Sequence, residues 1–435
     1  MGARLFVLLL AALASAAAVA SPLKIEHWTL ANGAHVHLVE AHDLPMVQLR
    51  VVFDAGAARD PRGRSGVALL TSGMLEEGTG NLGADDIARR FEDLGAEFGA
   101  SAERDMATVD LRSLSEWKLL EPALELFAQI IASPSFPSEA LERERARLLV
   151  ALARDAQSPG TIASRAFYRE LYGEHPYAAD PQGEEASIKT ITRDDLVAHH
   201  KSYYVGKNAH LVIVGDVTKR SARKIAERVA GKLPAGAPAP ALPAVPALEQ
   251  ARERRIAFPA TQSHVFLGQP GMTRDDPDYF PLYVGNYILG GGGLVSRLST
   301  EVREKRGLSY SVYSYFLPMR VSGPFVMGLQ TKNTQRAEAM GLIRKVLEDF
   351  VANGPTDQEV EAAKKHITGA FPLRLDSNRK IADNLAVIAF YGLPLTWLDD
   401  YIKRVQAVTG EQIRDAFRRR VHPDKLVDVV VGGGR

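Results

Sequence analysis

The chain has 435 residues, of which 46% are hydrophobic and 24% charged. This composition predicts a globular protein of roughly two to four domains and excludes a largely disordered chain. The 53 lysines and arginines nearly cancel the 52 aspartates and glutamates, which argues against a nucleic-acid partner. Cysteine is absent, which excludes disulfides, a lipid-modified cysteine, and thiolate ligands or nucleophiles.

Residues 1–20 have the layout of a secretory signal peptide. Arg4 gives a short basic start, the run from Leu5 to Leu13 is apolar, and small residues end at Ala20. The apolar run is too short for a stable bilayer anchor, although a short N-terminal anchor is the alternative. No later apolar stretch is long enough to span a bilayer, so we predict an exported protein, most consistent with a bacterial periplasm, without a stable membrane anchor after cleavage.

A run rich in proline and alanine, 234–250, divides the rest of the chain. Proline removes backbone donors and favours extended conformers, which argues against a helix or a central strand there. We interpret the run as a flexible linker between an N-terminal module, 21–233, and a C-terminal module, 251–435.

The same order of signals occurs on both sides of this linker. Matching helix starts lie 218 residues apart in one pair and 217 in another, which indicates an internal duplication. The matched features are the strands Val47–Phe53 and His264–Gln269, and the helix starts Ser138 with Thr356 and Thr192 with Thr409. We predict an α+β fold of two homologous modules, each a mixed or antiparallel sheet with helices packed on one face, and a cleft between the modules.

A helix is predicted from Ser65 onward, and its sequence has the frame of a metal-binding motif without the ligands. Gly66 to Thr79 reads GVALLTSGMLEEGT, which resembles the segment G-x-A-H-x-x-E-H-M-L-x-x-G-T of the pitrilysin and mitochondrial-processing-peptidase family. In that motif two histidines grip zinc and the glutamate deprotonates the bound water. Leu69, Ser72 and Gly73 stand at the three positions here, and none supplies a metal ligand or an adequate base.

The resemblance also implies a glutamate on a later helix as the third zinc ligand. Val150 and Ala151 align with a Glu-Glu pair of that family, and Ala151 is the predicted position of the lost ligand. Because every ligand and base position is then missing, we predict no cofactor in this chain, and the resemblance implies zinc in a partner subunit.

Two of the eleven histidines have a spacing that suits a different metal site. His35 and His37 are two residues apart, which places both on one face of a strand. The adjacent His199 and His200 point in different directions on a helix. An autonomous hydrolase built on His35 and His37 is one alternative for this pair, and solvated polar strand residues are the other.

Four consecutive glycines, Gly290 to Gly293, precede a helix predicted from near Leu294. The run lacks the Gly-Lys-Ser/Thr ending of a phosphate loop, which argues against nucleotide binding. Glycines permit unusual dihedrals and close backbone approach. We predict that this segment contacts a peptide substrate through Gly291, Gly292, Gly293 and Ser296.

The stretch from Ser296 to Tyr310 is similar, nearly position for position, to the family segment that carries a substrate-side arginine and tyrosine. Arg303 and Tyr310 occupy those two positions. The resemblance implies that they lie across a cleft from zinc, where a guanidinium or phenol donor stabilises the oxyanion formed at the attacked carbonyl. A solvated helix cation and a half-buried strand aromatic are the alternative for the same residues.

The resemblance covers the chain from about Lys24 to its end, and the family includes heterodimers in which one subunit holds zinc and the other the arginine and tyrosine. It therefore implies a zinc-less subunit of a periplasmic metallopeptidase, inert alone, that binds an unfolded peptide beside a homologous partner with an H-x-x-E-H motif. A catalytically silent peptide-binding or assembly protein is the alternative function.

Overall fold

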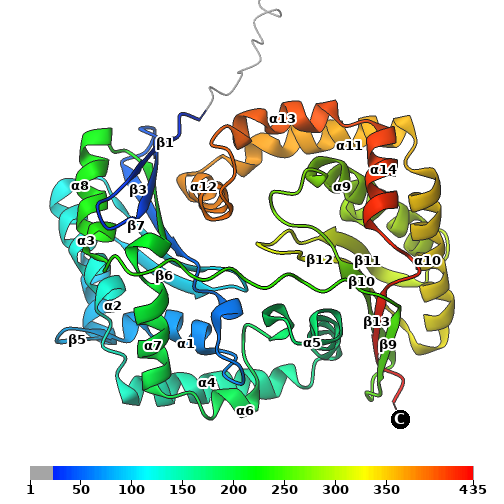
Figure 1. Ribbon diagram of the computed structural model, residues 1–435, viewed down its shortest axis with the longest axis horizontal. Coiled ribbons are helices and arrows are strands. Elements are labelled where there is room, and N and C mark those ends of the chain that lie inside the picture. Colours follow the sequence, from blue (N-terminus) through cyan, green and yellow to red (C-terminus); the bar gives the residue numbers. More distant parts are fainter. Residues whose placement is uncertain (1–22, 435) are drawn as a thin grey trace, which may run out of the picture.

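The computed structural model describes residues 23–434, so the predicted signal peptide, 1–20, lies outside the described residues. Two large sheets form the framework of this part of the chain (Figure 1). The first sheet contains β1 (Glu26–Thr29), β2 (His35–Glu40), β3 (Met46–Phe53), β6 (Glu97–Ala102), β7 (Ala107–Leu114) and β8 (Ala209–Gly215). The second contains β9 (Arg252–Ile256), β10 (Gln262–Pro270), β11 (Ser309–Phe316), β12 (Pro324–Lys332) and β13 (Val427–Val431).

The two sheets repeat one topology, β1-β2-β8-β3-β7-β6 and β11-β12-β10-β13-β9. In each, a central strand, β3 or β10, is antiparallel to both neighbours, and the pair next to it on one side, β2 with β8 or β9 with β13, is parallel; the first sheet has β1 as an additional edge strand beyond β2. Both sheets are therefore mixed, and the predicted α+β architecture is confirmed. A separate short hairpin joins β4 (Gly78–Thr79) to β5 (Leu82–Gly83).

Helices surround both sheets. Those of the first half are α1 (Val67–Gly73), α2 (Ala84–Asp93), α3 (Trp117–Ala132), α4 (Ser138–Asp155), α5 (Pro159–Tyr172), α6 (Glu185–Ile188), α7 (Arg193–Tyr203) and α8 (Lys219–Val229). Those of the second half are α9 (Tyr279–Asn286), α10 (Arg336–Asn353), α11 (Asp357–Ala370), α12 (Asn378–Tyr391), α13 (Trp397–Ala407) and α14 (Gly410–Arg420). None of these helices is both long enough and apolar enough to cross a bilayer.

Each sheet is covered on its second face by a helix from the other half of the chain. Helix α5 packs on β10 and β13, and helix α12 packs on β3 and β8. Because side chains alternate between the faces of a strand, Val51 lies in the first half's own core whereas Val52 is buried in the core cluster that contains α12. The prediction of helices on one face of each sheet is therefore incomplete: the two halves interlock.

Phe167 shows how closely these crossed elements approach. Its side chain on α5 is fully buried, and its ring centroid lies 6.0 Å from that of Phe266 on β10. A Cβ added to Gly268 would lie 2.8 Å from the Phe167 ring and 2.1 Å from the carbonyl oxygen of Phe325. The glycine in the strand thus makes room for both the helix and the adjacent strand.

Asp105 is a buried hydrogen-bonding centre between the two halves. Its side chain is 3% exposed and accepts from the hydroxyl of Tyr177 in the first half. It also accepts from the hydroxyl of Tyr391 on α12, at 3.0 Å, and from the amide of Arg320, at 2.8 Å. Three donors from distant parts of the chain therefore satisfy one buried carboxylate, as a buried charge requires.

The proline-rich segment makes hydrogen bonds to the body of the protein, and its role as a linker stays a prediction. Arg59 donates to the carbonyl of Pro240 at 2.7 Å, and His175 donates to that of Pro243 at 3.0 Å. Leu242 and Val245 pack against a buried cluster that contains residues of both halves. The segment crosses between the two sheets in extended conformation (Figure 1).

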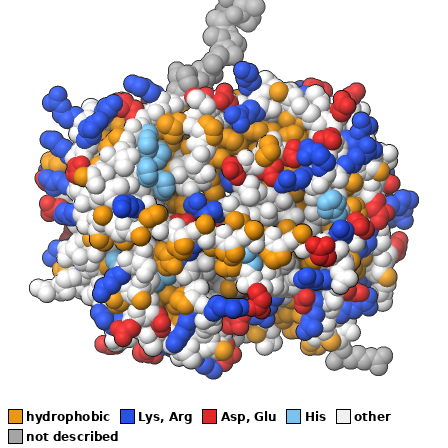
Figure 2. Space-filling view, in the orientation of Figure 1, with side chains coloured by type: hydrophobic (Ala, Val, Ile, Leu, Met, Phe, Trp, Pro, Cys, Tyr) orange, Lys and Arg blue, Asp and Glu red, His pale blue; other side chains and the backbone are white. Residues whose placement is uncertain are grey.

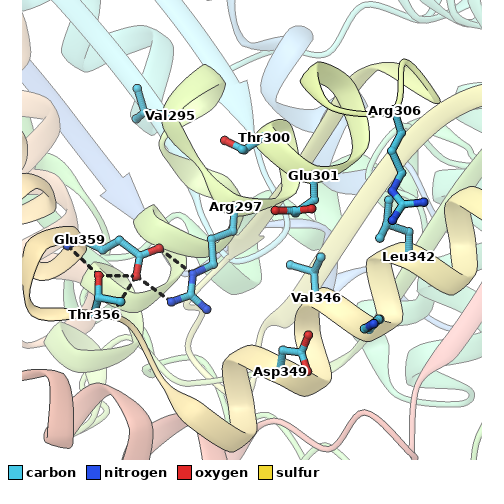
Figure 3. Close-up of a pocket in the computed structure, with 11 residues that line it drawn as sticks. Val295, Arg297, Thr300, Glu301, Arg306, Leu342, Val346, Asp349, Thr356 and Glu359 are labelled. Atoms are coloured by element: carbon cyan, nitrogen blue, oxygen red, sulfur yellow. Dashed lines mark hydrogen bonds and ion pairs between the residues drawn. The ribbon is translucent and has the colours of Figure 1, made fainter.

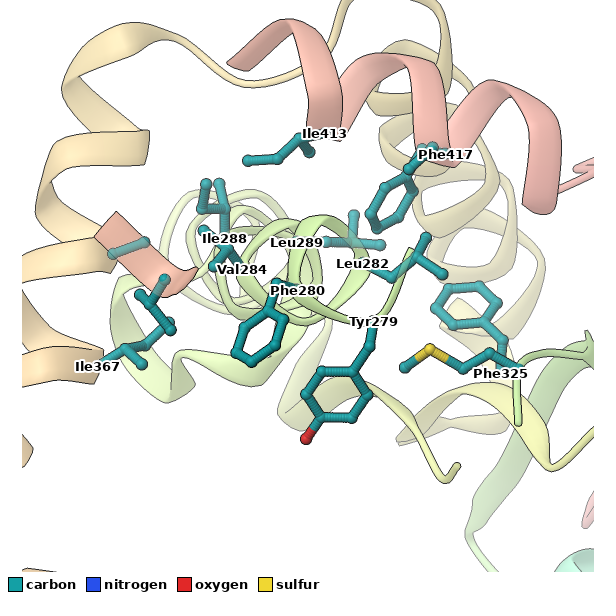
Figure 4. Close-up of a cluster of buried hydrophobic side chains, with 14 of the residues drawn as sticks. Tyr279, Phe280, Leu282, Val284, Ile288, Leu289, Phe325, Ile367, Ile413 and Phe417 are labelled. Carbon is teal, nitrogen blue, oxygen red and sulfur yellow. The ribbon is translucent and has the colours of Figure 1, made fainter. Parts of the chain in front are cut away.

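The second half has its core around α9 (Figure 4). Phe280, Val284 and Leu282 of this helix are buried among side chains of neighbouring helices, including Phe417 of α14. A Cβ on Gly285 would lie 2.4 Å from the Phe417 ring, so the glycine sets how closely α9 and α14 approach.

Most predicted helix starts agree with the structure. Thr192, Thr356 and Thr409 are N-caps with reciprocal capping boxes. Ser138 is the first residue of α4 rather than its N-cap, and Pro137, at the N-cap position, makes no side-chain cap. The helix predicted from near Leu294 begins three residues later: a 3₁₀ turn, Gly293–Val295, is followed from Arg297 by a helical stretch that includes an irregular helical segment, Ser299–Glu304.

Candidate functional site

The zinc-motif frame folds as predicted into a short helix, α1. Asp60 accepts from the amides of Gly66 and Ala68, both at 2.7 Å, and so fixes the start of this helix. Gly66 has φ +101°, a conformation that favours glycine. The frame residues thus build the helix even though the metal-binding chemistry is missing.

Leu69, Ser72 and Gly73 lie together beside one cavity of about 440 Å³. Ser72 is 1% exposed, and its Oγ is buried without a hydrogen-bond partner. A Cβ at Gly73 would meet open space. The helix thus presents an apolar side chain, a buried hydroxyl and a gap where the motif needs two imidazoles and a carboxylate.

Ala151 lies on α4, partly buried, and is not among the residues that line this cavity. Its neighbour Val150 is 72% exposed, unusual for a valine. Neither residue has a side chain able to bind metal. The assignment of the third ligand position to Ala151 therefore stays a prediction.

An edge strand forms another wall of the same cavity. Ala100, Ser101 and Ala102 of β6 line it, and β6 ends the first sheet because only β7 pairs with it in the described chain. A free strand edge offers unpaired amides and carbonyls to an extended peptide. This edge strand was not predicted from the sequence, since EFGASA has little strand character.

The structure brings Arg303 and Tyr310 together. The Cζ atom of Arg303 lies 4.4 Å from the centroid of the Tyr310 ring, within the range of a cation–π contact. Tyr310 is 82% exposed, and Arg303 is partly buried. The phenol and guanidinium donors are therefore available to a molecule outside the chain.

Two backbone features position this pair. Gly307, with φ +61°, turns the chain back after the irregular helical segment, and its amide donates to the carbonyl of Arg303 at 3.0 Å. The β11–β12 register then shifts between Ser309 and Ser311, which makes Tyr310 the bulged residue. A bulge redirects a side chain, and here it accounts for the outward position of Tyr310.

The glycine run spans the last two residues of the short helical segment Tyr287–Gly291, which continues α9, and the start of the turn after it; Gly290 is buried, whereas Gly291 and Gly293 are exposed. Gly293 has φ +63°, and Cβ atoms on Gly291 and Gly292 would lie 2.7 Å from the Asn286 side chain and the Tyr287 carbonyl oxygen. Leu294 and Val295, which follow, are 57% and 75% exposed. The predicted peptide contact of these glycines stays a prediction. The local backbone also favours glycine at these positions, because a side chain would clash at Gly291 and Gly292 and would be strained by the positive φ at Gly293.

Ser296 does not reach the surface, which corrects its predicted role in substrate contact. Its side chain is fully buried; Oγ donates to the carbonyl of Gly293 at 2.7 Å and accepts from the amide of Ser299 at 3.3 Å. Ser296 therefore holds the turn that precedes Arg303.

Arg297 fastens the same segment to α11 (Figure 3). Its guanidinium makes two 2.6 Å hydrogen bonds to the carboxylate of Glu359, which also accepts from the amide of Thr356 at 2.7 Å. Although partial burial opposes it, the bonds from Arg297 and Thr356 lower the pKa of Glu359 to about 2. Sequence reasoning missed this pair because Arg297 and Glu359 are far apart in the chain.

Arg297 and Glu359 border a cavity of about 550 Å³ (Figure 3). Basic and acidic side chains share its wall, among them Arg306, Lys345, Glu301 and Asp349. Because both charges are balanced there, the cavity shows no preference for a cation or an anion.

The histidine pair belongs to a larger group. His35 and His37 lie on β2 beside His27 of β1 and His210 of β8. Burial, with a contribution from the neighbouring histidines, lowers the pKa of His37 and of His210 to about 3. Across residues 23–434, no three His, Asp or Glu side chains stand with donor atoms already grouped to hold a metal ion.

The geometry does not favour a hydrolase at His35 and His37. In the described chain neither residue is hydrogen-bonded to a carboxylate; His35 is close to Thr29 Oγ1, at 3.3 Å, and to His27 Nε2, at 3.4 Å. A general base or an orienting carboxylate is what such a site would need.

Comparison with known proteins agrees with the resemblance. Residues 35–180 match the family model described as insulinase (peptidase family M16), and residues 190–367 match the one described as peptidase M16 inactive domain. A crystal structure of a peptidase M16 inactive domain from Pseudomonas fluorescens is 41% identical, with a TM-score of 0.91 over 94% of this chain and 98% of that chain.

Two curated relatives are more distant. The non-peptidase homolog YmxG of Helicobacter pylori is 27% identical over 92% of each chain. A mitochondrial-processing peptidase subunit beta from Lentinula edodes is 25% identical over 82% of this chain and 79% of its own. The chain therefore belongs to peptidase family M16, as a non-catalytic member whose zinc-motif positions hold Leu69, Ser72 and Gly73.

Proposed function

We propose that this chain is the zinc-less subunit of an exported, two-subunit M16 metallopeptidase. It binds an unfolded peptide and presents Arg303 and Tyr310 to the zinc site of a homologous partner that carries H-x-x-E-H. The observation that carries the proposal is the contrast between an assembled, solvent-facing Arg303–Tyr310 pair and a zinc helix without ligands.

The chemistry of the pair suits stabilisation of a developing negative charge. The partner's zinc would supply the activated water, and the carbonyl oxygen of the cleaved peptide becomes an oxyanion. Arg303 and Tyr310 each have an N–H or O–H to donate to that oxygen. A positioned donor of this type is typically worth about 3 kcal/mol of the activation barrier.

Peptide binding is supported by the free edge of β6. An extended peptide can add to this edge through main-chain hydrogen bonds, which recognise any sequence. The adjoining cavity beside Leu69, Ser72 and Gly73 leaves room for its side chains. Export rests on the signal-like residues 1–20 alone.

The test is co-expression of this chain with a homologue that has an intact zinc motif. Each protein alone and the copurified pair are assayed on a mixed peptide library, with metal analysis. We expect cleavage, and one zinc per pair, only for the complex, and a loss of roughly 100-fold in kcat for Arg303→Ala. Equal cleavage by the complex when both Arg303 and Tyr310 are replaced would refute the assigned role.

A catalytically silent peptide-binding or assembly protein is the second candidate. It is favoured by the same β6 edge and cavity, which need no partner. Fluorescence anisotropy with labelled unfolded peptides separates the two: full affinity in the isolated chain, and no complex with the zinc-bearing homologue, identifies the binding protein.

A further inference from the structure

Four histidines form a closed circuit on one face of the first sheet. Three adjacent strands supply them: His27 from β1, His35 and His37 from β2, and His210 from β8. His27 is the register partner of His37, and His35 that of His210. Figure 2 shows a group of histidine side chains at the surface, in the upper left of this face.

The spacing of the rings matches that of imidazoles around one metal ion. Ring centroids lie 5.6 Å apart for His27–His35, 5.2 Å for His35–His210, 6.0 Å for His37–His210 and 4.7 Å for His27–His37. Two imidazoles on a tetrahedral ion with metal–nitrogen bonds of about 2.0 Å have their centroids roughly 5 Å apart. All four sides of the circuit lie within about 1 Å of that value. The His27–His35 and His35–His210 rings are stacked, with interplanar angles of 16° and 17°, so a shared ion requires rings to turn from this arrangement.

One nitrogen pair is already at ligand spacing. His27 Nε2 and His35 Nδ1 are 3.4 Å apart, long for a hydrogen bond, whose usual N···O distance is about 2.9 Å. Two nitrogens on a tetrahedral ion are separated by roughly 3.3 Å, from the same bond lengths. The separation of this nitrogen pair is therefore also compatible with a shared ion.

The two inner histidines have unused nitrogens. His37 is 6% exposed, and its Nε2 is buried without a hydrogen-bond partner; Nδ1 of His210 is in the same condition. Most buried polar atoms in proteins are paired, and an unpaired one points to a missing water or ion. The unpaired nitrogens lie on the two rings that would have to complete the coordination.

We propose that His27, His35, His37 and His210 bind one divalent transition-metal ion of the Zn²⁺, Ni²⁺ or Cu²⁺ class. All-imidazole ligation selects these ions over Mg²⁺ and Ca²⁺, which prefer oxygen. The nitrogens do not yet converge, so binding turns the outer rings about their side-chain torsions. His27 is exposed and His35 partly exposed, so both have space to turn.

The site has four protein ligands and no open position, which is typical of a structural metal site. It joins the edge strand β1, only four residues long and paired with β2 alone, to the interior strand β8. The positive charge of Arg320 opposes a metal cation at His210, but Arg320 Nε lies 3.3 Å from the Asp54 carboxylate, which offsets that charge. Bound metal therefore fastens β1, independently of any peptidase partner.

The test uses the untagged, chelator-treated chain and Zn²⁺ in isothermal titration calorimetry, with hydrogen exchange of the β1 amides. We expect one Zn²⁺ per chain, slower exchange in β1 with the ion, and affinity weakened roughly 100-fold by His27→Ala or His210→Ala. His27→Ala alters an exposed side chain and keeps the fold testable. His42→Gln, on an exposed histidine paired with Asp216, is the matched control and leaves affinity unchanged.

Two results would overturn the proposal. One is an absence of Zn²⁺ binding in the millimolar range. The other is binding that survives both alanine substitutions, because the ion would then sit elsewhere.

Discussion

The guanidinium of Arg303 lies 4.4 Å above the ring of Tyr310, yet neither residue contributes to a buried core. Tyr310 is the bulged residue of β11 and is 82% exposed. An exposed cation–π contact contributes only about 0.5–1 kcal/mol to stability. The local backbone, with Gly307 at φ +61° and a shifted register, thus serves the placement of two donors more than the stability of the fold.

Arg303→Ala should therefore separate activity from stability. We expect the free energy of unfolding in urea to fall by less than about 1 kcal/mol, while kcat of the two-subunit complex falls roughly 100-fold. Arg306→Ala is the matched control, because Arg306 is an exposed cation of the same segment, 3.9 Å from Glu338. Equal losses of activity in both variants would show that general charge, and not the Arg303 donor, is what matters.

Restoring the motif should restore metal binding at α1. We expect the variant Leu69→His, Ser72→Glu, Gly73→His and Ala151→Glu to bind Zn²⁺ roughly 100-fold more tightly than the same variant without Ala151→Glu, because zinc sites use at least three protein ligands. The open space at Gly73 admits the new imidazole. The measurement is Zn²⁺ titration in a His27→Ala, His210→Ala background, which removes the four-histidine circuit.

The same titration decides the third ligand position. Val150→Glu replaces Ala151→Glu in a matched variant, since Val150 and Ala151 both align with the Glu-Glu pair of the family. Tighter binding with Val150→Glu would move the lost ligand to position 150.

Tyr391→Phe should weaken the junction between the two halves. Its hydroxyl donates to Asp105 Oδ2 at 3.0 Å in a buried site, and a hydrogen bond to a charged group contributes about 1.5–3 kcal/mol. We expect a loss of that size in urea unfolding, whereas Tyr310→Phe, with its exposed hydroxyl, should cost less than about 0.5 kcal/mol. If Tyr391→Phe leaves the free energy of unfolding unchanged, the hydrogen bonds from Tyr177 and from the Arg320 amide are enough to stabilise the buried Asp105 carboxylate.

Local sequence signals predicted much of the fold. The strand Val47–Phe53 and the capped helix starts at Thr192, Thr356 and Thr409 follow from apolar runs and capping chemistry, which act over a few residues. The pairing of Arg303 with Tyr310 was instead implied by the family resemblance of the stretch from Ser296 to Tyr310.

What the sequence did not predict depends on long-range packing. The exchange of α5 and α12 between sheets, and the anchoring of Pro240 and Pro243, involve partners far along the chain. Spacing identified His35 and His37, but only strand register adds His27 and His210 to them. Ser296 was assigned to substrate contact from its place in the motif, and its burial became visible only with the turn around it.

His199 should make the fold sensitive to mild acid. It is 4% exposed on α7, its Nε2 donates to the carbonyl of Ala55 at 3.1 Å, and burial lowers its pKa to about 4. As pH falls below about 6.5, the unfolded chain takes up a proton at this residue while the folded chain does not, so stability is full at neutral pH and declines until pH approaches 4. The loss attributable to His199 is on the order of 3 kcal/mol, from about 1.4 kcal/mol per pH unit.

His199→Gln keeps a donor for Ala55 and removes the titration. We therefore expect its urea midpoint to fall less steeply between pH 7 and pH 4 than that of the unsubstituted chain. His42→Gln is the control, since the hydrogen bond to Asp216 raises the pKa of His42 and removing it gives no protection against acid. If the urea midpoints of His199→Gln and of the unsubstituted chain fall equally between pH 7 and pH 4, His199 takes up no additional proton on unfolding. The acid response then arises from other groups.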